Sequence, residues 1–342
     1  MVSLLDLGVI WGVAIAVSLC VTGLVAVAGL GDVPGARSSH SRVTPTAGGL
    51  GIVAGFGAAF CLPGAATLVG SGSAAPALLA LVFAVAVVGL CDDAFGMGAR
   101  MKFALLLGLS GMAVAVIGPV ERLPTFAGGI ELPPHVGFAG AVLWIFVVVN
   151  AVNFIDGING LMAGVMNAAA MGVAGIAGAF GSGTVMVLAV ALSGALLGFL
   201  PYNFRVRARV FAGDVGALPV GFIFALLPLF MVRQTDPGAL YIAPLLILPV
   251  LADVFMTLIR RARRGERLLA AHRGHLYQIA ARRFSHMGVA SVYLGTVFPL
   301  TLGVLGLMAL GLEDSLGIVM VTAMLSGALV LVLARRWDDG PG

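Results

Sequence analysis

The chain has very little charge. Asp, Glu, Lys and Arg together make up 10% of its 342 residues, whereas 60% are hydrophobic and the mean hydropathy is +1.11. This composition excludes an ordinary soluble domain, in which about 25% of residues are charged. The formal net charge is only +4. Basic residues on the cytoplasmic side of a membrane protein account for this excess, so we expect no nucleic-acid partner.

Cysteine is scarce as well. Cys20, Cys61 and Cys91 fall inside or at the end of apolar segments, with no Cys-x-x-Cys pair and no metal-ligand spacing. A disulfide framework and a zinc site are therefore not expected. The chain also lacks His-Glu-x-x-His and Gly-x-Ser-x-Gly, which argues against an intramembrane protease.

Long apolar runs and 49 glycines are what the chain has in abundance. Glycine suits the close packing of helices in a bilayer, and windows of about 20 apolar residues mark possible spans. We therefore predict an all-α polytopic integral membrane protein with about 11 transmembrane helices, in one membrane-embedded domain over 1–342. The predicted spans are 7–30, 48–68, 74–91, 103–120, 137–153, 161–180, 184–200, 215–232, 238–259, 288–311 and 314–334.

The first of these segments is expected to be a retained span. It follows Asp6 rather than a basic stretch, and it is too long for the apolar part of a cleaved leader. The orientation follows from the basic residues, because every Lys and Arg except Arg122 and Arg233 falls in one set of alternate gaps. This positive-inside bias places the N-terminus outside, the C-terminus in the cytoplasm and the polar motifs on the cytoplasmic face of the inner (plasma) membrane.

One apolar run ends in polar side chains that lipid would not tolerate. The stretch 150–160 reads Asn-Ala-Val-Asn-Phe-Ile-Asp-Gly-Ile-Asn-Gly. Asn150 and Asn153 share a helix face, and Asp156 continues that face one turn further. The glycines that follow are expected to end the helix, which places Asp156 where the helix dipole favours a cation. The working hypothesis is a site for a metal and a charged substrate at the membrane surface.

An acidic pair, Asp92-Asp93, closes another apolar run. Adjacent carboxylates repel each other unless a cation or a base lies beside them. The pair therefore predicts either coordination of Mg²⁺ by oxygen ligands or salt bridges to Arg100 and Lys102.

Asp214 begins a later span between two glycines, after a segment that carries three arginines. An acidic side chain at the start of a helix is often only a cap. On the predicted topology, however, Asp214 lies on the same side as the other aspartates, which favours a functional role.

The longest predicted cytoplasmic segment, 260–287, is rich in arginine. Its first part could simply lie against anionic lipid. The stretch 272–278, His-Arg-Gly-His-Leu-Tyr-Gln, differs because His272, Arg273 and His275 offer donors to a diphosphate, while Tyr277 and Gln278 could contact a base or a sugar. Too few ligands lie nearby for a zinc site.

The first cytoplasmic gap contains Arg37, His40 and Arg42 and ends in glycines at 48, 49 and 51. Small residues at a helix start expose backbone N–H groups that can receive phosphate. A solvated polar loop explains the same composition.

Together these motifs resemble the polyprenyl-phosphate N-acetylhexosamine-1-phosphate transferases, glycosyltransferase family 4, which include the phospho-muramoyl-pentapeptide translocase. The motifs that carry the resemblance are Asp92-Asp93, the block 150–160, Gly213-Asp214-x-Gly216 and the block 272–277. The first loop, with Arg37-Ser-Ser-His40, is similar to the branch that primes O-antigen or other surface polysaccharides.

The resemblance implies transfer of a sugar-1-phosphate from a UDP-N-acetylhexosamine to undecaprenyl phosphate, with release of UMP and a requirement for Mg²⁺, or Mn²⁺ in its place. It implies catalytic roles for Asp92, Asp93, Asp156 and Asp214, and a metal site built from Asp214, Asn153 and Asp156. The substrate-binding residues that it implies are His40, Lys102, Asn150, Asn159, His272, Arg273 and His275. A homodimer is also consistent with the family.

Some positions depart from the family pattern. Asn159 replaces an aspartate, which removes a charge, and Ala217 replaces a serine. Thr46-Ala47 replaces a more basic pair, and the first loop differs from that of the muramoyl-pentapeptide enzyme, which argues against that substrate.

Two alternatives share part of the evidence. An ion-coupled transporter would place its acids near the middle of the bilayer, and Asp253 is the one acid predicted well inside a span, where Arg260 or Arg261 could pair with it. A hydrolase of lipid diphosphates would share the metal chemistry but would not need the long nucleotide-competent segment.

Overall fold

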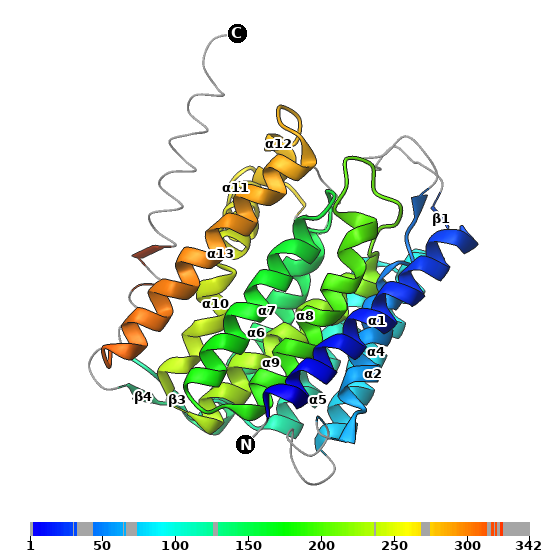
Figure 1. Ribbon diagram of the computed structural model, residues 1–342. Helices are drawn as coiled ribbons and strands as arrows, with labels where there is room; N and C mark the ends of the chain where they lie inside the picture. Colours follow the sequence, from blue (N-terminus) through cyan, green and yellow to red (C-terminus); the bar gives the residue numbers. More distant parts are fainter. Residues whose placement is uncertain are drawn as a thin grey trace.

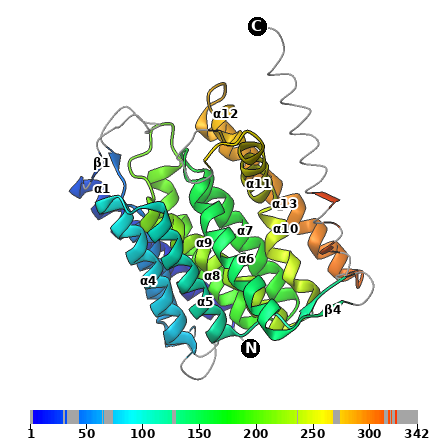
Figure 2. The ribbon, with the colours of Figure 1, turned by 180° about the vertical axis from the view of Figure 1, so that it is seen from behind.

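The structure is a computed structural model of the 342-residue chain. It describes residues 3–29, 31–32, 44–63, 65, 74–125, 129–235, 237–267 and 274–312, and five residues between 316 and 323. Within these ranges the protein is a bundle of long helices whose axes run side by side (Figures 1 and 2).

The elements, in chain order, are α1 (Leu4–Ala28), β1 (Gly31–Asp32), β2 (Thr44–Pro45), α2 (Gly49–Phe60), α4 (Ala74–Phe95), α5 (Ala99–Ile117), β3 (Arg122–Leu123), β4 (Ile130–Glu131), α6 (Pro134–Phe154), α7 (Leu161–Ala179), α8 (Gly183–Asn203), α9 (Asp214–Gln234), the 3-10 helix η1 (Pro237–Tyr241), α10 (Ile242–Leu246), α11 (Leu248–Arg263), α12 (Leu276–Ala280) and α13 (His286–Ala309). The strands form two antiparallel two-residue pairs, β1 with β2 and β3 with β4.

Eight helices of the described residues are long and apolar enough to cross a membrane. They are α1, α4, α5, α6, α7, α8, α9 and α13. Each coincides with a predicted span, so the all-α membrane class is confirmed. Lipid offers no hydrogen-bond partner to backbone N–H and C=O groups, and a helix can cross the bilayer because it pairs these groups internally.

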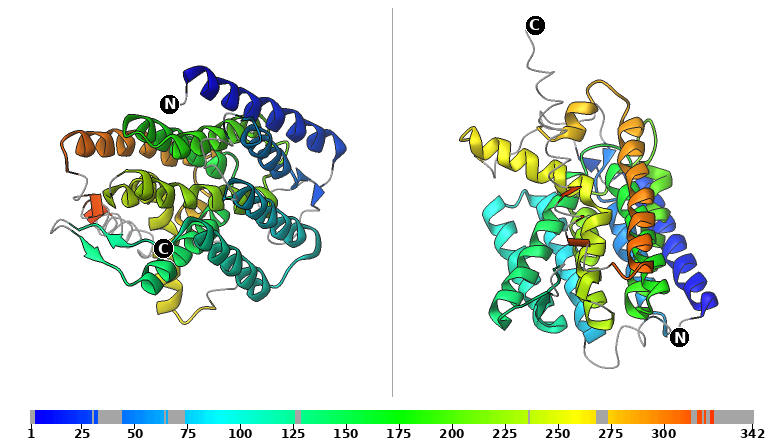
Figure 3. Two further views of the ribbon diagram at one scale, coloured as in Figure 1. Left: turned by 90° about the horizontal axis from the view of Figure 1, so that it is seen from below. Right: turned by 90° about the vertical axis from the view of Figure 1, so that its left-hand side faces the viewer.

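Two predicted spans differ from the structure. The span 238–259 is broken at Ile247, where the axis through η1 and α10 turns by 76° into α11. Figure 3 (right) shows α11 leaning across the end of the bundle. The two parts together are still long and apolar enough to cross a membrane as one bent span, so this span stays a prediction. Helix α11 is amphipathic and ends in several arginines, which favour an interface over the bilayer core.

The second difference lies at 48–68, where the described helix, α2, has 12 residues. This is shorter than the roughly 20 residues that cross a bilayer. Most of the predicted span 314–334 lies outside the described residues.

Helix α9 forms the centre of the bundle. Of its most apolar window, 94% is buried, against 28% for α1 and 22% for α13. Helices α2, α4, α6, α7 and α8 all pack on α9, and Figure 3 (left) shows α1 and α13 on the outside of the bundle. Because α9 begins with Asp214, this packing brings the first turn of α9 against the neighbouring helix ends.

Glycines allow this close packing around α9. A Cβ at Gly49 on α2 would collide with Gly216 on α9, and a Cβ at Gly89 on α4 would collide with the backbone of Asp214. Backbone bonds reinforce the first contact, since the N–H of Gly49 donates to the carbonyl of Ala212 at 3.0 Å. The small residues therefore set how near α2 and α4 come to the start of α9.

The sequence motifs lie at one end of the bundle. The C-terminal ends of α4, α6 and α8 and the N-terminal ends of α5, α7 and α9 meet there, together with α12, whereas β3 and β4 lie at the other end (Figure 1). The predicted orientation of that end toward the cytoplasm stays a prediction.

Gly49→Ala should destabilise the protein by about 1–3 kcal/mol, because the added methyl has no room between α2 and α9. Gly108→Ala on α5 is the matched control, since a Cβ there meets nothing within 4 Å. Thermal unfolding in detergent would compare the two variants. Equal melting temperatures would contradict the proposed role of glycine in this packing.

Candidate active site

A lysine joins two of the predicted catalytic aspartates. The Lys102 ammonium on α5 lies 2.6 Å from Oδ2 of Asp92 on α4 and 2.8 Å from Oδ2 of Asp214 on α9. All three side chains are between 15% and 19% exposed, so water screens these charges less than it would on an open surface. The sequence predicted salt bridges to Arg100 and Lys102 as one of two explanations for the acidic pair, and among the described residues the ion pairs are formed by Lys102.

Asp93 caps helix α9. Its two carboxylate oxygens accept hydrogen bonds from the backbone N–H groups of Asp214 and Val215, each at 3.0 Å. A carboxylate at this position satisfies N–H groups that have no partner within the helix and favours the positive end of the helix dipole. Asp92 and Asp93 are adjacent in sequence but contact different groups, because one meets an ammonium and the other meets backbone.

Gly213 makes this approach possible. Its φ angle is 66°, in the left-handed region that favours glycine. A Cβ at this position would also collide with the carbonyl of Thr46 and lie 2.7 Å from Oδ2 of Asp93. The glycine before Asp214 thus fixes the geometry of the turn that presents the aspartate.

Asp156 lies close enough to this group to feel its charge. It follows the last turn of α6, and it is half-buried. Burial raises the pKa of the Asp156 carboxyl well above its usual value, and the nearby Asp214 and Asp93 carboxylates raise it further. The structure therefore brings all four predicted catalytic aspartates to one place.

The two asparagines on the same helix differ in their surroundings. The side-chain N–H of Asn150 donates to the carbonyl of Phe146 at 2.7 Å, whereas its Oδ1 atom is buried without a hydrogen-bond partner among the described residues. A buried oxygen of this kind is costly unless another group meets it. Asn153 is half-buried on the last turn of α6.

Asn159 holds the loop that follows α8. Its side-chain N–H groups donate to the carbonyls of Arg205 at 2.9 Å and Val206 at 3.4 Å. Asn203 supports the same loop, since it accepts from Gly160 N–H at 2.7 Å and donates to the carbonyl of Val210 at 3.0 Å. The substrate contact predicted for Asn159 stays a prediction, and the structure adds a positioning role.

Sequence reasoning did not find Asn203. The only signal was an amide at the end of a span, in Pro201-Tyr-Asn-Phe204. Buried amides of this type need hydrogen-bond partners, but their identity depends on how the loop folds back.

Asp253 anchors the segment that contains His275. Its carboxylate accepts from the backbone N–H of Leu276 at 2.7 Å and of Tyr277 at 3.1 Å. The carboxylate also accepts from the Tyr293 hydroxyl at 3.1 Å and lies 3.6 Å from Nδ1 of His275. The prediction that Arg260 or Arg261 pairs with Asp253 was wrong, because the carboxylate meets groups of α12 and α13, whereas the two arginines lie about two turns further along the same helix.

The same segment is fastened to the end of α6. The Tyr277 hydroxyl donates to the carbonyl of Phe154 at 2.7 Å, and a Cβ at Gly157 would collide with this hydroxyl. Burial, then the charges of Asp253 and Asp156, raise the pKa of Tyr277, so the phenol keeps its proton and remains a donor. The phenol is 1% exposed and donates within the protein; its predicted contact with a base or a sugar stays a prediction.

His275 is held within this arrangement. Its ring stacks on Tyr277 and lies against Phe154, with centroid distances of 5.8 Å in both cases, and the residue is 3% exposed. Gln278 accepts from the His275 backbone N–H. The remaining predicted substrate residues, His40, His272 and Arg273, lie outside the described residues.

The oxygen donors suit a divalent cation such as Mg²⁺ or Mn²⁺. Hard cations prefer carboxylate and amide oxygens, and Mg²⁺ commonly uses one or two carboxylates together with substrate phosphates. Among the described residues, no group of three or more His, Cys, Asp and Glu forms a preformed metal site. The carboxylates of Asp92 and Asp214 nevertheless contact the same Nζ atom of Lys102, so their oxygens converge on one positive charge.

The comparisons with known proteins agree with this chemistry. The model of glycosyl transferase family 4 matches residues 75–232, which include Asp92, Asp156 and Asp214. A probable undecaprenyl-phosphate N-acetylglucosaminyl 1-phosphate transferase of Bacillus subtilis is 30% identical over 276 residues, which cover 79% of this chain and 75% of the relative. The chain belongs to glycosyl transferase family 4.

Other members of family 4 match the chain as well. A decaprenyl-phosphate N-acetylglucosaminephosphotransferase of Mycobacterium tuberculosis is 28% identical over 336 residues, covering 90% of this chain and 83% of the relative. A phospho-N-acetylmuramoyl-pentapeptide-transferase of Moorella thermoacetica is 33% identical over 192 residues, covering 52% and 56%. The family resemblance inferred from the motifs is confirmed.

Asp253→Asn should loosen the segment around His275 in this family 4 protein. The amide keeps the size of the side chain but loses the charge that holds Leu276 and Tyr277 N–H. A hydrogen bond to a charged group contributes about 1.5–3 kcal/mol, so amide exchange at these two residues should accelerate roughly tenfold or more.

Hydrogen exchange monitored by mass spectrometry would measure this change. Glu266→Gln serves as the control, because this exposed acid contacts Arg261 away from α12. Unchanged exchange at 276–277 in Asp253→Asn would show that the carboxylate does not anchor the segment.

Proposed function

We propose that the protein transfers an N-acetylhexosamine-1-phosphate from a UDP-sugar to undecaprenyl phosphate or another polyprenyl phosphate and releases UMP. The product would start a lipid-linked surface glycan, such as O-antigen. The observation that carries the proposal is the group of carboxylates around Lys102 in a member of family 4. The polyprenyl-phosphate transferases among its relatives support the substrate classes.

The position of the carboxylates suits two substrates that meet at a membrane surface. Asp92, Asp156 and Asp214 lie at one end of the helix bundle, where a soluble nucleotide sugar and a lipid phosphate can both reach them. A transporter would place such groups near the middle of the bilayer. The positive-inside bias makes this end the cytoplasmic one.

The two anionic substrates repel each other unless their charge is neutralised. A bound Mg²⁺ would stabilise the charge on the transferring phosphate and the leaving UMP. Asp214 and Asp156 would hold this ion, with Asn153 ordering the site. Lys102 would contribute a second positive charge beside the phosphates, at a position already fixed by Asp92 and Asp214.

Asp93 has a different task in this scheme. Because it caps α9 through Asp214 N–H and Val215 N–H, it would hold Asp214 in place rather than take a proton. The phosphate monoester of the acceptor is already an anionic nucleophile, so positioning and charge stabilisation account for the reaction without a base.

The proposal can be tested by incubating the protein in membranes with undecaprenyl phosphate, Mg²⁺ and a panel of UDP-N-acetylhexosamines. UMP should appear with at least one donor, and the best donor identifies the amino sugar. No UMP with any member of the panel would overturn the proposal.

Asp214→Asn should reduce UMP formation by about 100-fold or more, because it removes a charge that the transition state depends on. Asp6→Asn is the control, since Asp6 caps the exposed start of α1 at the other end of the bundle. Full activity in Asp214→Asn would remove this residue from the metal site.

A further inference from the structure

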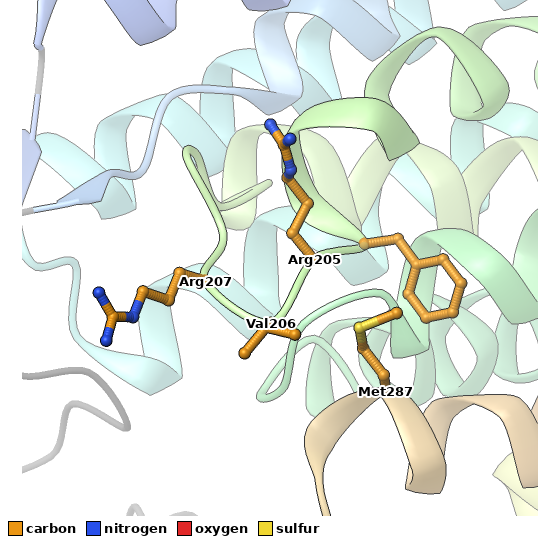
Figure 4. Close-up of a pocket in the computed structure, with 5 residues that line it drawn as sticks. Arg205, Val206, Arg207 and Met287 are labelled. Atoms are coloured by element: carbon orange, nitrogen blue, oxygen red, sulfur yellow. The ribbon is translucent and has the colours of Figure 1, made fainter.

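A shallow, open hollow lies beside the loop that follows α8. It has a volume of about 600 Å³ and lies between this loop and the first turn of α13. Its lining consists of Phe204, Arg205, Val206, Arg207 and Met287. Figure 4 shows Val206 and Met287 facing each other, with the two arginine side chains extending from the loop.

The two arginines carry charge that the chain itself does not neutralise. In the part of the chain that the structure describes, neither Arg205 nor Arg207 forms a salt bridge with a carboxylate. Their loop is nevertheless held in place, because Asn159 donates to the carbonyls of Arg205 and Val206. The two side chains extend from this fixed backbone in different directions (Figure 4), and the guanidinium group pairs especially well with phosphate.

The rest of the hollow is apolar and continues along a helix. Val206 is 84% exposed, and Met287 begins a stripe on α13 that continues at helical spacing through Leu294, Phe298 and Leu302. Phe298 is 70% exposed and Leu302 is 52% exposed. In a membrane protein, exposed side chains of this kind along a span contact acyl chains.

The hollow therefore combines a phosphate-binding end with an apolar path that leads into the bilayer. We propose that it binds an acidic glycerophospholipid, whose phosphate pairs with Arg205 and Arg207 while an acyl chain lies along the α13 stripe from Met287 to Leu302. A soluble phosphate compound would use the arginines but leave the apolar stripe without a role. Basic side chains at the end of a span commonly meet anionic lipid in this way.

The experiment uses the full-length protein, delipidated in detergent and titrated with phosphatidylglycerol or phosphatidylcholine. Native mass spectrometry counts the bound lipids. The wild-type protein should retain one phosphatidylglycerol molecule in preference to phosphatidylcholine. In Arg205→Gln/Arg207→Gln the affinity for phosphatidylglycerol should fall about thirtyfold, since two charges near the headgroup are lost.

The control is Arg263→Gln/Arg264→Gln, which removes the same charge from two exposed arginines at the end of α11. This variant should keep the bound lipid. Equal loss in both double variants would mean that the lipid responds to overall charge, and the proposed site would be wrong.

A third variant tests the hollow itself. Met287→Trp adds bulk at the start of the stripe and keeps both arginines, so it should also release the lipid. If this variant fails to fold, the result for Arg205→Gln/Arg207→Gln tests the proposal. Inorganic phosphate that displaces phosphatidylglycerol would indicate a simple anion site. Undecaprenyl phosphate that displaces it at equal concentration would assign the hollow to the acceptor lipid, and either result would overturn the proposal.

Discussion

Four carboxylates gathered at the end of an apolar bundle repel each other, and the rest of the structure depends on how that repulsion is offset. Two positive groups do so. The Lys102 ammonium lies between Asp92 and Asp214, and the N-terminal turn of α9 donates to Asp93. Among the described residues Asp156 forms no ion pair, and burial beside the other acids raises the pKa of its carboxyl. This remaining negative charge is the physical reason to propose a divalent cation there.

Bringing these charges together requires helices that approach closely. Glycines on α2 and α4 allow both helices to contact the first turn of α9, and the burial of α9 follows from its place between them. Packing and electrostatics are thus linked, because a larger side chain at Gly89 would displace the backbone of Asp214. The glycine-rich composition serves the site as well as the membrane fold.

Contacts from the chain after residue 232, outside the family match at 75–232, also reach the carboxylate site. The bend at Ile247 turns α11 across the bundle, so that Asp253 can hold α12 and Tyr277 can reach the end of α6 beside Asp156. The chain after residue 232 therefore packs against the end of α6 that leads to Asp156. It also supplies Met287, which lines the proposed lipid site.

The sequence by itself determined the class of protein and the end of the bundle at which its motifs lie. Hydrophobic length and period are local properties, so they predicted eight of the long helices and placed Asp92, Asp156 and Asp214 at helix ends that meet. Only the tertiary structure decided the partners. It placed Lys102 between Asp92 and Asp214, joined Asp253 to α12 rather than to Arg260 or Arg261, and gave Asn159 a loop to hold. The reason is physical: hydrogen bonds and ion pairs form over about 3–4 Å, and such distances between segments far apart in the chain are set by packing and by the bend at Ile247, which no local pattern encodes.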